Sequence, residues 1–166
     1  MRPVELVADT DVVSYMYKGG ALGAMFSDLV GSSSTGITLQ SLAELHYWAA
    51  RNNWGHRKIA SLDAFLSRFL LLESDPEIAN ISGAIRARCD QVGRAISWPD
   101  AWVAATALWL RVPLVAHDRD LERIPGLRVL TVHKNWQIRE ESAVPAHAGV
   151  LWLSERSADA GYSFVN

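Results

Sequence analysis

Four acidic residues, widely separated along the chain, have side chains that could together bind a divalent cation. Asp9 and Asp118 each follow a short apolar run, and Glu44 and Asp100 lie near the starts of segments with helical apolar spacing. Carboxylate oxygens select hard cations such as Mg²⁺ or Mn²⁺ over zinc. Carboxylates that lie close together without a cation repel one another, and their pKa values shift until some protonate. These residues therefore predict a metal site if the fold brings them together.

Each of these acids could instead have a purely structural role at a helix start. The segments Ser41-x-x-Glu44 and Ser97-x-x-Asp100 have the form of a capping box or a close variant of one. Asp9 could cap the helix that follows it, and Asp118 could cap a turn over residues 119–123. Capping does not require that all four side chains lie at one edge of a sheet, so such a coincidence would favour metal binding.

Short apolar runs alternate with helical patterns along the chain. Strands are predicted at residues 4–8, 36–39, 113–116 and 127–132. Helices are predicted over 12–30 with a break at 18–20, from 41 to 49 with Glu44 in the first turn, and from 98 to 110. The stretch 56–92, interrupted near 74–76, is predicted to form a pair of helices on one side of the sheet. The alternation predicts an α/β fold with a mainly parallel sheet.

In such a sheet the carboxyl ends of the strands and the amino ends of the following helices share one edge, where ligands bind. Asp9 and Asp118 are expected at strand ends, and Glu44 and Asp100 at helix starts. The coarse fold therefore predicts that all four carboxylates lie along the same edge.

Composition limits the class of protein. The 166 residues, 49% of them hydrophobic, suffice for one packed core. No apolar run approaches the ~20 residues that span a bilayer, and the single cysteine, Cys89, has no partner for an internal disulfide, so we expect a cytoplasmic protein. The net charge of −2 argues against a generally basic nucleic-acid-binding surface, which leaves local contacts.

At the level of motifs, the chain resembles the PIN-domain ribonucleases, and in particular the VapC toxins of toxin–antitoxin pairs. The resemblance covers residues 4–132 and rests on four stretches in order: Leu6–Val13, Leu42–Leu45, Asp100–Ala107 and Leu114–Leu121. It implies a PIN-like three-layer fold for residues 1–133, in which helices flank a mainly parallel central sheet. Residues 134–166 would form a C-terminal extension.

The resemblance also implies roles for individual residues. Asp9, Glu44, Asp100 and Asp118 would form the catalytic metal site for Mg²⁺ or Mn²⁺. Asp120 is close enough in sequence to be the fourth ligand, although Asp118 is preferred because it lies nearer the strand end. Thr10 and Asp11, which follow Asp9, would support the site. Arg119 would contact the RNA.

A VapC-like protein would hydrolyse RNA phosphodiesters, form a homodimer and be inhibited by a VapB-type antitoxin. Two other functions stay open. The segment Asp9-Thr10-Asp11 is also similar to the nucleophile motif of haloacid-dehalogenase phosphatases. Alternatively, the chain could be a PIN-like binding module without turnover. Trp98, Trp102 and Trp109 share one helical face, for which a core or subunit contact is expected before base stacking.

Overall fold

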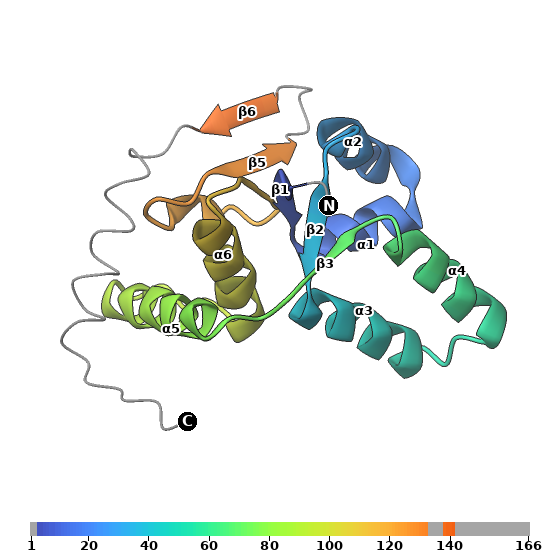
Figure 1. The fold of residues 1–166 in the computed structure, drawn as a ribbon, viewed down its shortest axis with the longest axis horizontal. Helices are drawn as coiled ribbons and strands as arrows, with labels where there is room; N and C mark the ends of the chain where they lie inside the picture. Colours follow the sequence, from blue (N-terminus) through green and yellow to red (C-terminus); the bar gives the residue numbers. More distant parts are fainter. Residues whose placement is uncertain (1–2, 133–137, 142–166) are drawn as a thin grey trace.

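The computed structural model describes residues 3–132 and 138–141, and its centre is a six-stranded sheet (Figure 1). The strand order is β3-β2-β1-β4-β5-β6. The pairs among the first five strands are parallel, and β6 pairs antiparallel to β5. The bounds are β1 Leu6–Ala8, β2 Thr35–Thr38, β3 Leu70–Leu72, β4 Leu114–Val115, β5 Val129–Val132 and β6 Ile138–Glu141. The prediction of an α/β fold with a mainly parallel sheet is confirmed.

Strand β1 lies in the middle of the sheet because its residues are apolar on both faces. Leu6, Val7 and Ala8 are all buried, as expected for a parallel strand covered on two sides. Successive side chains of a strand point to opposite faces. Val7 accordingly packs in one hydrophobic core, and Leu6 and Ala8 pack in the other.

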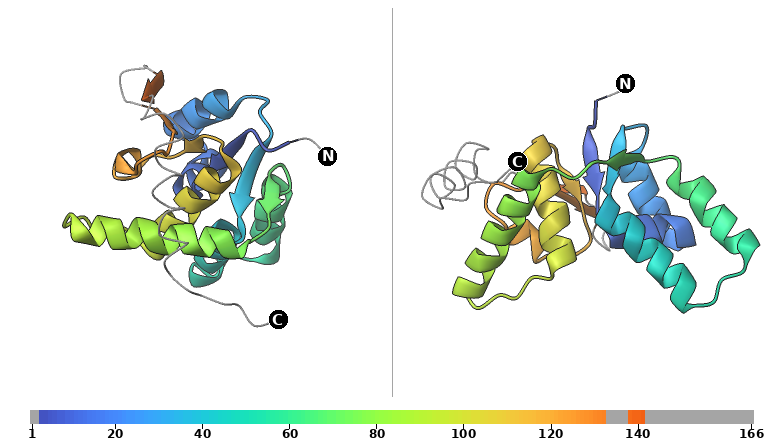
Figure 2. Two further views of the ribbon diagram at one scale, coloured as in Figure 1. Left: turned by 60° about the vertical axis from the view of Figure 1, so that its left-hand side comes forward. Right: turned by 60° about the horizontal axis from the view of Figure 1, so that its bottom comes forward.

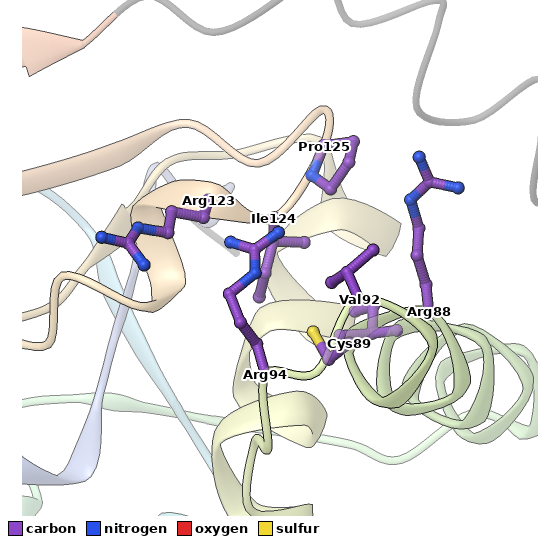
Figure 3. A pocket seen from close by; sticks show the side chains of 8 residues that line it. Arg88, Cys89, Val92, Arg94, Arg123, Ile124 and Pro125 are labelled. Atoms are coloured by element: carbon purple, nitrogen blue, oxygen red, sulfur yellow. The ribbon is translucent and has the colours of Figure 1, made fainter.

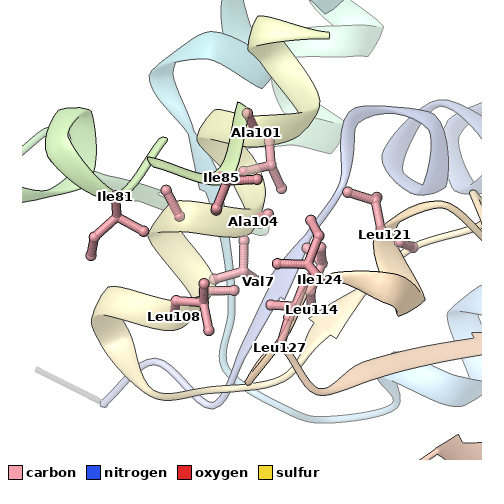
Figure 4. Close-up of a cluster of buried hydrophobic side chains, with 14 of the residues drawn as sticks. Val7, Ile81, Ile85, Ala101, Ala104, Leu108, Leu114, Leu121, Ile124 and Leu127 are labelled. Carbon is pink, nitrogen blue, oxygen red and sulfur yellow. The ribbon is translucent and has the colours of Figure 1, made fainter. Parts of the chain in front are cut away.

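Helices cover both faces of this sheet and create three layers. Five of them follow the first strands and the sixth precedes β4: α1 Thr10–Lys18, α2 Gly20–Val30, α3 Leu39–Arg51, α4 His56–Leu66, α5 Pro76–Gln91 and α6 Trp98–Leu110. Helices α5 and α6 lie on one side of the sheet, and α1 to α4 lie on the other (Figures 1 and 2). The first core centres on α6, whose alanines allow close packing against Val7 and Leu114 (Figure 4).

The predicted break in the first helical segment is confirmed. Gly19 and Gly20 both have positive φ, 74° and 81°, a region that side chains with a Cβ rarely adopt. The Gly19 amide donates to the Tyr15 carbonyl and ends α1, and α2 begins at the next residue. The two glycines therefore reverse the chain so that α2 packs back on α1.

The prediction for residues 56–92 is wrong in two respects. Strand β3 lies between the two helices, and the helices lie on opposite sides of the sheet. Leu62 of α4 belongs to the core with α1, α2 and α3, whereas Ile81 of α5 belongs to the core with α6. The chain crosses at the sheet edge because the apolar run Leu70–Leu72 pairs with β2.

The segment after residue 133 contributes strand β6 to the sheet beside β5. Residues 133–137 and 142–166 lie outside the described residues, so the assignment of residues 134–166 to a C-terminal extension stays a prediction. No helix among residues 3–132 has the length and apolar character required to cross a bilayer.

Candidate active site

Asp9 lies where β1 ends and α1 begins, at the carboxyl edge of the sheet. Its backbone amide donates to the Val115 carbonyl of β4, which fixes this position between two parallel strands. Its side chain caps α1 by accepting the Thr10 amide at 2.8 Å. The carboxylate is only 4% exposed. Asp9 is therefore the N-cap of α1. A cap does not require a buried carboxylate, so capping alone does not account for the burial of Asp9.

Glu44 reaches the same region from α3. The prediction that it lies in the first turn of this helix is wrong, and the alternative of a capping box with Ser41 is wrong as well. Thr38 is the residue that caps α3, by accepting the Ser41 amide at 3.0 Å, and this places Glu44 in the second turn. The Thr10 hydroxyl donates to Glu44 Oε2 at 2.6 Å and so joins α3 to the start of α1.

Asp100 is presented by the first turn of α6. Ser97 caps this helix, accepting the Asp100 amide at 3.1 Å, and its hydroxyl donates to Asp100 Oδ2 at 2.5 Å. Pro99 lies in the first turn, where the missing N–H costs no hydrogen bond. Ser97 therefore caps the helix, as the Ser97-x-x-Asp100 spacing indicated. The Asp100 carboxylate is half-buried and stays available for a second partner.

The four acids nearest the end of β1 form one electrostatic group. The pKa of Asp9 is raised to about 7, mainly because burial disfavours its charged form. The negative charges of Asp100, Asp11 and Glu44 add to the rise, and the hydrogen bond from the Thr10 amide opposes it. Without a positive charge beside it, Asp9 would therefore be only partly ionised near neutral pH.

Asp118 and Asp120 belong to the loop that follows β4. In register, β4 lies beside β1, with Ala8 opposite Val115, so this loop leaves the sheet at the edge occupied by Asp9. Asp118 accepts the Asp120 amide at 2.9 Å, and Asp120 lies 3.5 Å from the Arg123 guanidinium. Neither acid is among the groups that raise the pKa of Asp9. The geometry thus groups three of the four predicted ligands and leaves the fourth exposed nearby.

The donor set suits a hard cation. All the candidate ligands offer carboxylate oxygens, which Mg²⁺ and Mn²⁺ prefer. Within the described residues, no three acidic, histidine or cysteine side chains are arranged closely enough to form a complete ligand set. The carboxylates of four residues instead each accept a hydrogen bond from a nearby amide or hydroxyl: Asp9, Glu44, Asp100 and Asp118. These side chains would have to turn toward a cation to bind it, and a cation would relieve the repulsion around Asp9.

Serine and threonine hydroxyls between α1 and α3 support the acidic group, a feature the sequence predicted only for Thr10. The Thr10 hydroxyl also lies 3.0 Å from Ser41 Oγ, which is fully buried and lies 3.1 Å from Thr38 Oγ1. The signal in the sequence is the Ser41-x-x-Glu44 spacing, which also has the form of a capping box. The buried Ser41 instead links the cap of α3 to Thr10.

Two of the described histidines have partners outside the acidic group. His117 packs its ring edgewise against Tyr15 and Phe26, and His46 lies 3.5 Å from Asp63. Trp98 and Trp109 are 59% and 44% exposed, so the predicted tryptophan face of α6 is not a core element over its full length.

A small basic pocket lies on the α5 side of the site, at the C-terminal end of α5. Arg94 and Arg123 extend into the same space from two segments, with Cys89, Val92 and Ile124 as apolar neighbours (Figure 3). Arg94 precedes the α6 cap by three residues, and Arg123 ends the short helix after Asp120 (η1, Leu121–Arg123). The sequence did not single out this pair, because the residues are 29 positions apart.

Comparison with known proteins identifies the architecture. Residues 6–127 match the PIN domain family. A ribonuclease VapC2 from Haemophilus influenzae is 29% identical over 134 residues, which cover 80% of this chain and 98% of the relative. A tRNA(fMet)-specific endonuclease VapC from Salmonella typhimurium is 32% identical over 94 residues, covering 56% of this chain and 71% of the relative.

A solved structure agrees with the sequence relatives. The crystal structure of DNA-bound VapBC from Salmonella typhimurium contains a chain that is 27% identical, with a TM-score of 0.68. The match covers 77% of this chain and 98% of that chain. The matched family region contains Asp9, Glu44, Asp100 and Asp118, and the similarity favours a nuclease over the haloacid-dehalogenase alternative. The chain belongs to the PIN-domain family, and its relatives within that family are VapC proteins.

Proposed function

We propose that this protein is a Mg²⁺- or Mn²⁺-dependent endoribonuclease that acts as the toxin of a toxin–antitoxin pair. The observation that carries the proposal is the convergence of Asp9, Glu44 and Asp100, from three separate elements, around the carboxyl end of β1. The relatives named as ribonucleases supply the substrate class. Repulsion among these carboxylates supports a bound cation as the missing partner.

In this proposal Asp9, Glu44 and Asp100 hold the cation, and Asp118 or Asp120 completes the set from the loop after β4. A divalent cation held by these residues would lower the pKa of a bound water and would stabilise charge on the leaving oxygen. Thr10 keeps the Glu44 carboxylate directed toward α1, and Ser97 does the same for Asp100 toward the start of α6. The arginines Arg119 and Arg123 lie in the adjoining segment and could contact the phosphates of the substrate.

The partner we propose is a VapB-type antitoxin, because the structural relatives include VapBC complexes. A cationic side chain of such a partner would be attracted to the same carboxylates that bind the metal. We also propose a homodimer, and the exposed rings of Trp98 and Trp109 offer apolar area for it.

The direct test is cleavage of purified RNA by the full chain with Mg²⁺, with Mn²⁺ and with EDTA. Asp9→Asn and Asp100→Asn should abolish cutting while the protein stays folded. Asp28→Asn is the matched control, because Asp28 is an exposed acid of α2 away from the end of β1. Cutting that persists in EDTA, or in both site variants, would rule out the proposed site.

A further inference from the structure

An open pocket of about 530 Å³ lies between the C-terminal ends of α1 and α3 and the start of α4. Trp48 and Trp54 meet in its wall with ring centroids 4.6 Å apart, and Tyr17 lies 5.8 Å from Trp54. Both indoles are half-buried. Pockets of this size, with aromatic walls and a few polar groups, are typical of ligand sites.

Two cations stand over these rings. The ammonium of Lys18 lies 4.4 Å from the centroid of Trp48, and that of Lys58 lies 3.6 Å from the centroid of Trp54. The whole chain has three lysines, and two of the three contact tryptophans in this one pocket. No acidic residue lines it. In a chain with a net charge of −2, this is a strongly local concentration of positive charge next to flat apolar surface.

The pocket is directly connected to the acidic group by two helices. At one end of the α1 and α3 pair, Thr10 bonds to Glu44; at the other end, Lys18 lies over Trp48. Glu44 and Trp48 are four residues apart and therefore share a face of α3. Eight residues separate Thr10 from Lys18, so the pocket lies about 12 Å from the acidic group along the helix axis.

We infer that this pocket binds an unpaired nucleotide of the RNA substrate, with its base against the Trp48 and Trp54 rings and its phosphates on Lys18 and Lys58. Indole faces stack on any base, and lysines neutralise the backbone. The contact of an exposed ammonium with a ring is weaker than base stacking, so the lysines can leave the rings for phosphates. A separation of about 12 Å corresponds to a few nucleotides of a stacked strand. The inference rests on the proposed function because it assigns the strand that the acidic group would cut.

The alternative occupant is an acidic peptide of a partner protein. The pocket suits a nucleotide better than an acidic peptide, because each nucleotide carries a flat base and a phosphate charge at a fixed spacing. The two neighbouring indoles can contact the base, and the two lysines can move onto the phosphate. The pocket is therefore a specificity site for single-stranded RNA or loops, in which bases are free to stack.

Binding can be measured without cleavage. We would use the full chain carrying Asp100→Asn, in EDTA, with a labelled single-stranded oligoribonucleotide of mixed sequence. A matched strand with abasic positions and an acidic peptide would serve as comparison ligands. Trp48→Ala should weaken RNA binding by about five- to one-hundred-fold, the range for the loss of one stacked base. Lys58→Ala should reduce the slope of log K against log salt by about 0.7, the value for one phosphate contact on a single strand.

Matched controls separate the pocket from general effects. Tyr47→Ala removes an exposed aromatic side chain of α3, and Arg68→Ala removes a cation that stands over Phe65, 5.4 Å from its centroid; both residues lie outside the pocket lining. Both should bind RNA like the parent, and Trp48→Phe should recover most of the affinity. Unchanged affinity and salt slope in folded Trp48→Ala and Lys58→Ala proteins would overturn the inference, as would tight peptide binding that these changes abolish while RNA binding stays.

This experiment keeps the two proposals apart. A chain that fails to cut RNA but shows these losses would support the pocket and contradict the catalytic proposal. A chain that cuts RNA with metal, and binds it equally well without Trp48, would do the reverse.

Discussion

Asp9 has a local structural role, and its burial disfavours the charged form that the role uses. Its carboxylate caps α1, a role that an exposed side chain could fill equally well. Its burial beside Glu44 and Asp100 works against the charged form. Proteins rarely bury a charge without a partner. The capping role alone does not require this burial, and the proposed cation would compensate for it.

This conflict predicts an unusual pH dependence for the metal-free protein. Asp9 ionises near its ordinary value of 3.8 when unfolded but only near 7 when folded. The unfolded state therefore binds fewer protons between these values, and the free energy of unfolding should fall as pH rises through this window. Compared with Asp9→Asn, the parent should lose about 3 kcal/mol more between pH 5 and pH 8.

Urea unfolding in EDTA at the two pH values would measure this difference. Glu5→Gln provides a control, because Glu5 accepts the Ser34 amide at the opposite end of β1. A difference between parent and Asp9→Asn that does not change with pH would mean that the Asp9 carboxyl is not buried among other acids.

The sequence contained enough information to place Asp9 and Asp100, because each directly follows a recognisable boundary. An apolar run ends at Asp9, and Ser97 with Pro99 marks the start of α6. Glu44 was harder to place, because three possible hydroxyl caps, Thr35, Thr38 and Ser41, precede it. Only the register of β2, which ends at Thr38, decides which hydroxyl caps the helix.

At the scale of the helix, α6 has the most demanding position, since it presents Asp100 and also forms much of one core. Its seven buried residues include Ala101, Ala104 and Ala105, which let it pack closely on the sheet. Its N-terminal cap thus affects both stability and the direction of Asp100.

We expect Ser97→Ala to lower stability by about 1 kcal/mol through loss of the cap. It should also lower RNA cleavage at subsaturating metal, because the Ser97 hydroxyl no longer orients the Asp100 carboxylate. Asp75→Ala is the matched control: Asp75 caps α5 by accepting the Glu77 amide at 2.8 Å, and it is not among the acids that raise the pKa of Asp9.

Thermal unfolding and cleavage assays together would decide the point. Both variants should melt at lower temperatures, and only Ser97→Ala should require more metal for half-maximal activity. Equal metal requirements for the two would show that Ser97 acts on stability alone.

The close approach of α1 and α2 depends on Gly23. A Cβ at this position would lie 2.3 Å from the Tyr15 carbonyl oxygen, which is backbone and cannot move without shifting a helix. We expect Gly23→Ala to destabilise the protein by about 1–3 kcal/mol. Gly83→Ala in α5 meets no atom within 4 Å and should instead stabilise by about 0.5–1 kcal/mol, because alanine favours the helix.

Denaturant unfolding of both variants would test these opposite changes in the free energy of unfolding. A stable Gly23→Ala protein would mean that the two helices do not cross as closely as the structure has them.

Strand β3 shows why the element order could not be predicted completely. The run Phe69–Leu72 continues the apolar spacing of the preceding helix, and three leucines favour a helix at least as strongly as a strand. Pairing with β2 gives this run its extended form, and that pairing is a contact between residues about 34 positions apart. The same crossing moves α5 to the opposite face from α4, which local patterns did not indicate.

For the molecule as a whole, a cation at the acidic group should act as a cross-link between layers. Asp9 directly follows β1 of the central sheet, Glu44 lies in a helix on one face and Asp100 lies in a helix on the other. A ligand that binds only this folded arrangement stabilises it by mass action, by about 2.7 kcal/mol at a concentration one hundred times Kd.

We therefore expect Mg²⁺ or Mn²⁺ to raise Tm by several degrees over the value in EDTA. Asp9→Asn and Asp100→Asn should remove most of this rise, whereas Asp28→Asn should keep it. Differential scanning calorimetry with a metal titration would measure the effect. An equal rise in all four proteins would indicate weak ion binding elsewhere on the acidic surface.

The central place of β1 in the sheet also has a consequence for biosynthesis. Strand β1 can pair with β2 early in synthesis, but its other neighbour, β4, is synthesised only at residues 114–115. Between Asp9 and Asp118, translation at 5–20 residues per second takes about 5 to 20 seconds. A nascent chain thus carries an incomplete acidic group while the residues between Asp9 and Asp118 are translated, and the nuclease site is assembled only after this span has been read.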